Sequence, residues 1–258
     1  MTVDRVPWSD KMRNRVLCAA LAAGLGGCDV IGFASGVGAA LIEGEHYSVE
    51  QGEVRWISYT SGPSTPSRRV QTLDADAGSF EIAEDPIYGT DRHQVFCKAT
   101  VLGGGDPDQF RVLRTGKDGP SMATDGRQVW HYCDRVGGAD GATFRLIGGE
   151  YGTDATGVYL LSSRIEGADP DSFRIIDAET RLGADTDRAY AGIFPIPTDR
   201  PGALRPLGAG YSTDGQQVYW QQFLLEGADV ATFEVRDGER FGRDASGCWI
   251  GPALKECL

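Results

Sequence analysis

Short runs in which apolar and polar residues alternate recur along most of the chain. In Phe173-Arg-Ile-Ile176 and Phe233-Glu-Val-Arg236 the alternation suits a strand with one buried face. Pairs of a branched and a ring side chain, such as Val158-Tyr159, lie between these runs and favour a pleated surface. Asp-Gly pairs at 125–126 and 214–215 mark turns before such pairs. The pattern therefore predicts short β-strands joined by turns.

These strands belong to a tandem repeat. Six times, an Asp is followed four residues later by a small or branched apolar residue and five residues later by an aromatic residue. The six positions are Asp91, Asp125, Asp154, Asp185, Asp214 and Asp244, whose successive spacings are 34, 29, 31, 29 and 30 residues. A fixed period of this kind identifies a repeat architecture.

Each repeat continues with a second Asp, at Asp106, Asp140, Asp169, Asp199 or Asp229. Four residues later comes Phe110, Phe144, Phe173 or Phe233, whereas the fourth repeat has Leu204 after a one-residue slip. Around Asp169-Pro-Asp-Ser-Phe173 the Asp can accept backbone N–H bonds and Pro170 fixes φ, as in a tight turn. We therefore expect two or three short strands and one capped turn in each repeat.

The repeated Asp residues are also potential ligands of a divalent cation. Calcium takes roughly six to eight oxygen ligands, whereas each turn here offers one or two carboxylates. Because each Asp recurs at the same place in its repeat, we predict structural turn caps and no metal. The predicted caps are Asp91, Asp125, Asp154, Asp185, Asp214, Asp244, Asp106, Asp140, Asp169 and Asp229. A divalent-metal-binding protein is kept as an alternative.

The repeat resembles that of the DKNYY family of bacterial proteins. The resemblance is carried by Tyr151-Gly-Thr-Asp154, Val158-Tyr159 and Ile165-Glu-Gly-Ala-Asp169, with their equivalents over about residues 88–250. The family's Lys-Asn after the first Asp is missing. Its second Tyr is replaced by Cys97, His131, Leu160, Ala191 or Trp220. The resemblance implies the packing pattern and assigns no catalytic residue.

We predict an all-β domain over residues 47–258, built from antiparallel β-hairpin units of about 30 residues. Partial units at Tyr47–Trp56 and Leu73–Phe80, and a short last unit ending after Trp249, are expected to cap the array. Propeller blades need roughly 40 residues or more. An open, gently curved array is therefore the first expectation, and a closed propeller-like ring is the alternative.

The N-terminus is similar to a bacterial lipoprotein signal. Basic residues precede an apolar stretch that ends at Leu25-Gly-Gly-Cys28, which predicts a signal peptide over 1–27 and a lipidated Cys28. Residues 28–46 would then be an apolar tether or a first element. Either Met1 or Met12 is the start. An uncleaved membrane anchor and a cytosolic chain with an apolar first element are the alternatives.

Charge narrows the class of partners. Removal of residues 1–27 takes away four basic and two acidic residues, which leaves 21 basic and 35 acidic residues and a net charge of −14. Such a chain is repelled by nucleic acids and by anionic headgroups. We therefore expect no nucleic-acid partner, and contact with the membrane through the lipid anchor only.

The remaining cysteines predict two disulfides and an oxidising compartment. Cys97 and Cys133 follow their repeat Asp by six and eight residues. They would share one face of neighbouring strands if those strands paired in repeat register. Cys248 and Cys257 would staple the C-terminal unit. Four free buried thiols are the alternative.

Function is sought where the repeat fails. Phe194, Pro195, Pro197 and Pro201 form a proline-rich segment that is a possible partner-binding loop. One residue of each adjacent pair Trp130/His131, Tyr159/Leu160 and Tyr219/Trp220 faces outward or meets a neighbouring layer. An exposed row of these side chains could bind sugars or peptides by stacking.

The chain is accordingly expected to be a lipid-anchored protein of the bacterial cell envelope, facing the periplasm or the outside. Its predicted role is a binding or scaffold module for an unknown protein or glycan, with no catalysis and no cofactor. A purely structural envelope component, and an unrecognised enzyme around His93 or His131, are the alternatives.

Overall fold

The computed structural model describes residues 44–60, 67–113 and 121–257, without the side chain of residue 60. The predicted signal peptide, Cys28 and nearly all of the predicted tether lie outside these residues. In the part described, the chain is almost entirely β-structure, with one 3-10 turn, η1 (Pro201–Ala203). No helix in this part is long and apolar enough to cross a membrane.

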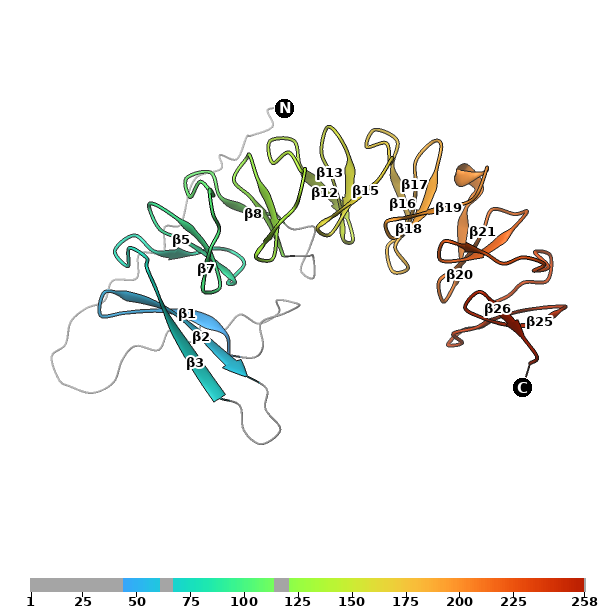
Figure 1. Ribbon diagram of the computed structural model, residues 1–258, viewed down its shortest axis with the longest axis horizontal. Helices are drawn as coiled ribbons and strands as arrows, with labels where there is room; N and C mark the ends of the chain where they lie inside the picture. Colours follow the sequence, from blue (N-terminus) through green and yellow to red (C-terminus); the bar gives the residue numbers. More distant parts are fainter. Residues whose placement is uncertain (1–43, 61–66, 114–120, 258) are drawn as a thin grey trace, which may run out of the picture. The chain divides into compact units, whose positions relative to one another are not determined.

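The described residues form seven small antiparallel sheets that follow one another along the chain (Figure 1). We number them sheets 1 to 7. Sheet 1 holds β1 (His46–Glu50), β2 (Glu53–Thr60) and β3 (Ser67–Leu73). Sheet 2 holds β4 (Glu81–Ile82), β5 (Tyr88–Thr90), β6 (Val95–Cys97) and β7 (Thr100–Val101). Sheet 3 holds β8 (Arg111–Leu113), β9 (Met122–Thr124), β10 (Val129–His131) and β11 (Asp134–Arg135).

The later sheets repeat this plan. Sheet 4 holds β12 (Arg145–Gly148), β13 (Tyr151–Thr153), β14 (Val158–Leu160) and β15 (Ser163–Ile165). Sheet 5 holds β16 (Arg174–Asp177), β17 (Leu182–Ala184), β18 (Ala189–Ala191) and β19 (Phe194–Ile196). Sheet 6 holds β20 (Arg205–Gly208), β21 (Tyr211–Thr213), β22 (Val218–Trp220) and β23 (Phe223–Leu224). Sheet 7 holds β24 (Gly242–Asp244), β25 (Gly247–Ile250) and β26 (Ala253–Lys255).

A complete unit therefore has four strands, and the expectation of two or three was wrong. The strands follow chain order as a meander, and the turn that carries the first Asp joins the second strand to the third. In sheet 4 this pairing is Tyr151 with Leu160, Gly152 with Tyr159 and Thr153 with Val158. Strand pairing stays within each sheet, so the described residues close no barrel. The all-β tandem-repeat prediction is confirmed.

The hydrophobic core lies between consecutive sheets. One cluster joins Val129 and Val136 of sheet 3 to Phe144 and Tyr159 of sheet 4. The next joins Tyr151 and Val158 of sheet 4 to Tyr190 of sheet 5. Each fully buried side chain of this size contributes about 1.5–3 kcal/mol through removal of apolar surface from water. A single sheet has no core of its own, so the repeat stabilises itself only as a stack.

Tyrosine hydroxyls tie neighbouring sheets together at the start of the second strand. The Tyr88 hydroxyl donates to the carbonyl oxygens of Tyr132 and Ser121 at 2.7 and 3.2 Å. The Tyr211 hydroxyl donates to the Trp249 carbonyl at 2.7 Å. Tyr151 occupies the same place in sheet 4, but its buried hydroxyl has no hydrogen-bond partner among the described residues.

Candidate functional site

The first Asp of each repeat is a hydrogen-bond acceptor at the turn between the second and third strands. In sheet 4, Oδ1 of Asp154 accepts the backbone N–H groups of Thr156 and Gly157 at 2.7 and 2.9 Å. Its Oδ2 accepts the backbone N–H of Asp140 at 2.8 Å and the hydroxyl of Tyr159 at 3.0 Å. One carboxylate thus joins its own turn, the preceding turn and the buried aromatic of the next strand.

The first Asp of six repeats and the second Asp of four repeats accept backbone hydrogen bonds. The Oδ1 atoms of the first set accept N–H groups two and three residues ahead, in Asp91, Asp125, Asp154, Asp185, Asp214 and Asp244. The Oδ1 atoms of the second set accept the N–H two residues ahead, in Asp106, Asp140, Asp169 and Asp229. In sheet 6, where the repeat slips by one residue, Oδ2 of Asp214 accepts the hydroxyl of Thr198 at 2.7 Å. In sheet 4 the equivalent Oδ2 atom accepts the backbone N–H of the second Asp.

These bonds set the charge state of the carboxylates. Burial raises the pKa of Asp154, but the hydrogen bonds from Asp140, Thr156 and Tyr159 outweigh it and hold that pKa below its usual value. The same opposition leaves the pKa lowered for Asp125, Asp214 and Asp244. Among the described residues, no three His, Cys, Asp or Glu side chains form a group able to hold a metal ion.

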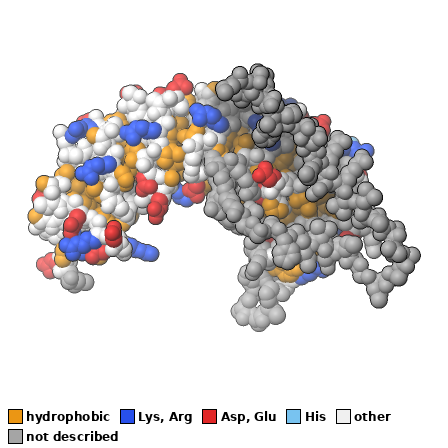
Figure 2. All heavy atoms as spheres, turned by 180° about the vertical axis from the view of Figure 1, so that it is seen from behind, with side chains coloured by type: hydrophobic (Ala, Val, Ile, Leu, Met, Phe, Trp, Pro, Cys, Tyr) orange, Lys and Arg blue, Asp and Glu red, His pale blue; other side chains and the backbone are white. Residues whose placement is uncertain are grey.

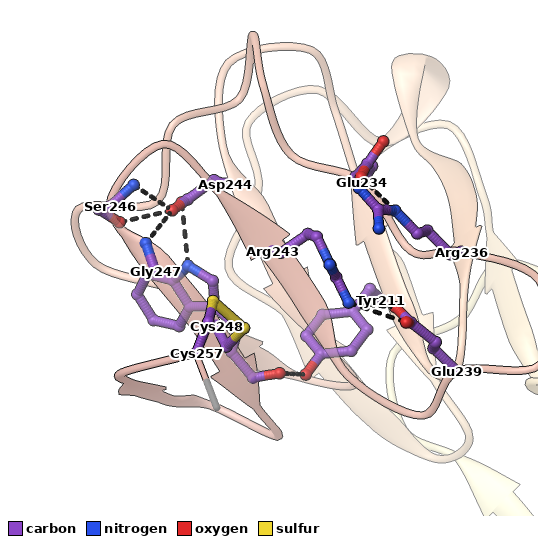
Figure 3. Close-up of a disulfide and its surroundings, with 11 residues drawn as sticks. Tyr211, Glu234, Arg236, Glu239, Arg243, Asp244, Ser246, Gly247, Cys248 and Cys257 are labelled. Carbon is purple, nitrogen blue, oxygen red and sulfur yellow. Dashed lines mark hydrogen bonds and ion pairs between the residues drawn. A yellow bond between two sulfur atoms is a disulfide. The ribbon is translucent and has the colours of Figure 1, made fainter.

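Two disulfides join the predicted cysteine pairs. Cys97 and Cys133 are bonded across sheets 2 and 3, with Cα atoms 5.3 Å apart. Cys97 ends β6, whereas Cys133 lies in the turn between β10 and β11. Strands β6 and β10 belong to different sheets and do not pair, so the condition under which the sequence placed the two cysteines on one face is not met, although the bond is present. Cys248 and Cys257 are bonded within sheet 7, beside the turn of Asp244 (Figure 3).

A groove crosses the ends of the third strands in sheets 3 to 6, on the side of the turn that leads into the fourth strand. Its volume is about 910 Å³ and it is open to solvent. The alternation of the third strand decides which aromatic residues reach it. Trp130, Tyr159 and Tyr219 are buried in the core, whereas the neighbouring residues His131, Leu160 and Trp220 line the groove.

Part of the groove lining comes from positions where the repeat is irregular. At the position six residues after the first Asp, sheet 5 has Ala191, between Leu160 of sheet 4 and Trp220 of sheet 6. Gly192 follows it with φ 62°, a conformation that glycine adopts without strain. Ala191 packs in the cluster of Leu182 and Ile196, and it is smaller than the residues at the same place in sheets 4 and 6. In addition, the link from Phe173 to Leu182 is two residues longer than the link from Phe144 to Tyr151, and it lines the groove.

An ion pair crosses the groove lining from sheet 4 to sheet 5. Nε of Arg181 lies 2.6 Å from a carboxylate oxygen of Glu150. Both side chains are partly exposed, so the pair contributes at most about 1 kcal/mol to stability. His131 lines the same groove, and burial lowers the pKa of its imidazole against the opposing effect of Glu150 and Asp134. The other histidine singled out from the sequence, His93, is exposed in the turn after Asp91.

Exposed aromatic residues flank the groove on sheets 5 and 6. Phe194 lines it with 52% of its surface exposed. The Trp220 ring stacks on Phe223, with centroids 6.2 Å apart and an interplanar angle of 15°. On the face seen in Figure 2, hydrophobic side chains lie beside Lys and Arg side chains over the C-terminal sheets.

The structure separates the four residues of the proline-rich segment. Phe194 and Pro195 lie in the edge strand β19, where Pro195 is exposed. Pro197 is exposed as well, whereas Pro201 is buried at the start of η1. Only Phe194 of the four lines the groove. Sequence reasoning missed Glu150 and Arg181, and the longer link before Leu182 was a signal for Arg181 alone.

Comparison with known proteins agrees with the repeat. The sequence pattern of the DKNYY family matches residues 59–192, a little over half of the 258-residue chain. No curated protein and no solved structure matches the chain. On the strength of the family match and of the repeating unit described above, this chain belongs to the DKNYY family.

Proposed function

We propose that this protein is a lipid-anchored component of the bacterial cell envelope that binds another molecule in the groove over sheets 3 to 6, without catalysis. The observation that carries the proposal is the groove itself. It lies where the repeat departs from its own rule, at Ala191 and at the long link that supplies Arg181. Packing explains a regular residue, whereas the largely exposed ring of Phe194 at the groove has no packing role.

The anchor is supported by the N-terminal sequence. Basic residues, an apolar stretch and Gly26-Gly-Cys28 follow in the order of a lipoprotein signal. Mass spectrometry of the protein from the membrane fraction tests it. A chain that begins at a diacylglycerol-modified Cys28 is expected, and a Cys28→Ser variant should leave that fraction. An intact N-terminus would contradict the anchor.

Binding is tested in the native cell with a photo-reactive phenylalanine analogue at position 194. A discrete covalent adduct is expected, because Phe194 is exposed and lines the groove. Adding Ala191→Tyr should abolish the adduct, because it replaces a small residue of the groove lining with a large one between Leu160 and Trp220. Larger side chains already occupy the equivalent position in other sheets, so the fold should tolerate this change.

A matched control keeps the result specific. Ala155 is exposed in the turn after Asp154, where sheet 2 has Arg92. Ala155→Tyr should therefore leave the adduct unchanged, and the analogue placed at 155 should give none. A purely structural role predicts that position 194 gives no adduct, or one that Ala191→Tyr does not affect.

A further inference from the structure

We infer that the groove takes an uncharged oligosaccharide, with Phe194 as a platform for a sugar ring and with Glu150, Arg181 and Gln222 as partners of its hydroxyl groups. This inference rests on the proposed function, since it names the ligand of the same groove. The groove volume of about 910 Å³ lies at the upper end of the range of roughly 300–1,000 Å³ for small-molecule sites, which suits an oligomer better than a single sugar.

The aromatic residues supply the apolar part of such a site. One face of a pyranose ring carries C–H bonds, and it packs on the flat face of an aromatic side chain. Phe194 is 52% exposed at the groove, although exposure costs hydrophobic burial. Trp220 forms a wall whose orientation is fixed by its stacking on Phe223. A fixed wall loses little conformational freedom when a ligand binds.

The polar residues of the groove supply hydrogen-bond donors and acceptors for sugar hydroxyl groups. A sugar hydroxyl donates one hydrogen bond and accepts others, so it is best met by donors and acceptors side by side. The bonded pair of Glu150 and Arg181, 2.6 Å apart, presents a carboxylate and a guanidinium together. Gln222 adds an amide, which has a donor and an acceptor on one planar group.

Charge favours an uncharged ligand. The groove lining contains Glu150, Glu179 and Arg181, of which the first and third neutralise each other. The chain carries a net charge of −12, or −14 without residues 1–27, which disfavours an anionic polymer. A cationic ligand would meet one further carboxylate among the described lining residues, that of Glu179, which gives little selection for charge.

The edge strand of sheet 5 argues against an extended peptide. Peptides commonly bind by adding a strand to an exposed edge through main-chain hydrogen bonds. β19 is such an edge strand, but its central residue is Pro195, which has no N–H to donate. Main-chain pairing along β19 is therefore interrupted at its centre, which disfavours a peptide strand there.

The test uses the full-length protein in detergent micelles and an array of short uncharged oligosaccharides, namely glucans, mannans, galactans and N-acetylglucosamine oligomers. At least one is expected to bind, and calorimetry with that glycan gives the affinities of the variants. Phe194→Ala should weaken binding about tenfold or more, the loss expected when a stacking residue at a binding centre is truncated. Ala191→Tyr should abolish binding, whereas Ala155→Tyr should leave it unchanged.

The position-194 adduct from cells separates this inference from the proposed function. Mass increments of repeating sugar residues would support an oligosaccharide. An adduct that depends on Ala191 but is made of amino acids would overturn the saccharide ligand and leave groove binding in place. The absence of both an adduct and array binding would overturn both. Array binding that Ala191→Tyr does not reduce would place the sugar outside the groove and also overturn the inference.

Discussion

At the scale of single residues, a phenylalanine ring lies against a glycine in four of the sheets. The pairs are Phe80 with Gly89, Phe144 with Gly152, Phe173 with Gly183 and Phe233 with Gly242. Three of the glycines lie in the second strand of their sheet, and Gly242 lies in β24, the first strand of sheet 7. Each phenylalanine ends a turn that begins at an Asp four residues before it. A β-carbon on the glycine would overlap the ring. The glycine is thus required for close approach of the ring to the backbone, not for an unusual φ angle.

We predict that Gly152→Ala destabilises the protein by about 1–3 kcal/mol, because the new methyl group forces the Phe144 ring out of its site. The measurement is the free energy of unfolding from urea titration. Gly137→Ala is the matched control, since nothing lies within 4 Å of a β-carbon there. It should be neutral or slightly stabilising. Equal effects of the two changes would contradict the ring-on-glycine account.

The Asp154 carboxylate predicts a loss of stability in acid. Hydrogen bonds hold its folded pKa below the usual value of 3.8 despite burial. The stabilisation is therefore complete above the unfolded pKa and is lost as pH falls through the lower folded pKa. Urea titrations between pH 7 and pH 3 should show a plateau above about pH 5 and a decline below about pH 4.

Asp154→Asn should weaken that decline and also destabilise the protein at pH 7 by about 1–3 kcal/mol, because an amide NH2 in place of Oδ2 would face the donors of Asp140 and Tyr159. Asp171→Asn, at an exposed position in the next sheet-to-sheet turn, is the control and should change neither quantity. An unchanged acid decline in Asp154→Asn would show that other groups cause it.

The capping of the turns could be predicted from the sequence because Asp bonds to backbone groups only two or three residues away. The hydrogen-bond partner of the Asp Oδ2 atom could not be predicted. In Asp154 it is an N–H fourteen residues earlier, which reaches the carboxylate only after two sheets have packed. The orphan hydroxyl of Tyr151 was equally hidden, since Tyr88 and Tyr211 at the same place in the repeat are satisfied.

At the scale of elements, the first and third strands of a unit were evident from the sequence, as at Phe173–Ile176 and Val158-Tyr159, and the other two were not. The second and fourth strands have two or three residues, which is too short for an alternation to show. One of them, β19, has Pro195 at its centre, and proline normally argues against a strand. It is tolerated because β19 is an edge strand, whose outer side needs no donor.

Each disulfide acts on a different element, and their removal should have different consequences. Cys97–Cys133 closes a loop of 36 residues across two sheets, whereas Cys248–Cys257 closes a loop of 9 residues within the last one. Loop-closure entropy gives about 3–4 kcal/mol for the first and about 2–3 kcal/mol for the second. The double variant Cys97→Ala/Cys133→Ala should therefore lower the unfolding free energy more.

Limited proteolysis under native conditions shows which sheets lose stability when a disulfide is removed. Cys248→Ala/Cys257→Ala should expose sites after Gly242 while sheets 2 to 6 stay protected, because the C-terminal unit has a neighbour on one side only. Two results would contradict the assignment of each bond to its element. One is cleavage within sheets 2 and 3 of the Cys248→Ala/Cys257→Ala variant. The other is no cleavage of the Cys97→Ala/Cys133→Ala variant at a higher protease concentration.

At the scale of the whole molecule, the repeat period fixed the fold class but not the groove. The period could be counted along the chain, and it implied units that pack on their neighbours. The groove depends on three residues that are far apart in sequence, namely Leu160, Ala191 and Trp220, and on how their sheets stack. Taken alone, each residue is only a position at which the repeat sequence has diverged. They form one site only because their sheets pack side by side, and the spacing of residues in the sequence does not predict that packing.

Stacking through nearest neighbours predicts that a whole unit can be removed. Deleting residues 154–184 joins Thr153 to Asp185, so the first two strands of sheet 4 continue into the last two of sheet 5. The new sheet keeps the register, because Gly152 then faces Tyr190 as Gly183 does now. We expect a folded protein with a β-type circular dichroism spectrum and a urea m-value lower by roughly one seventh, since m follows the surface exposed on unfolding.

The contrasting variant deletes residues 154–183, one residue fewer, and joins Thr153 to Ala184. A shift by one residue turns the buried face of a strand toward solvent. This variant should aggregate or remain unfolded, although it retains more of the chain. If both deletions fold equally well, register at this junction does not specify the stack. If the longer deletion also unfolds, contacts beyond the nearest neighbour hold the array together, and its stability is not a sum over adjacent sheets.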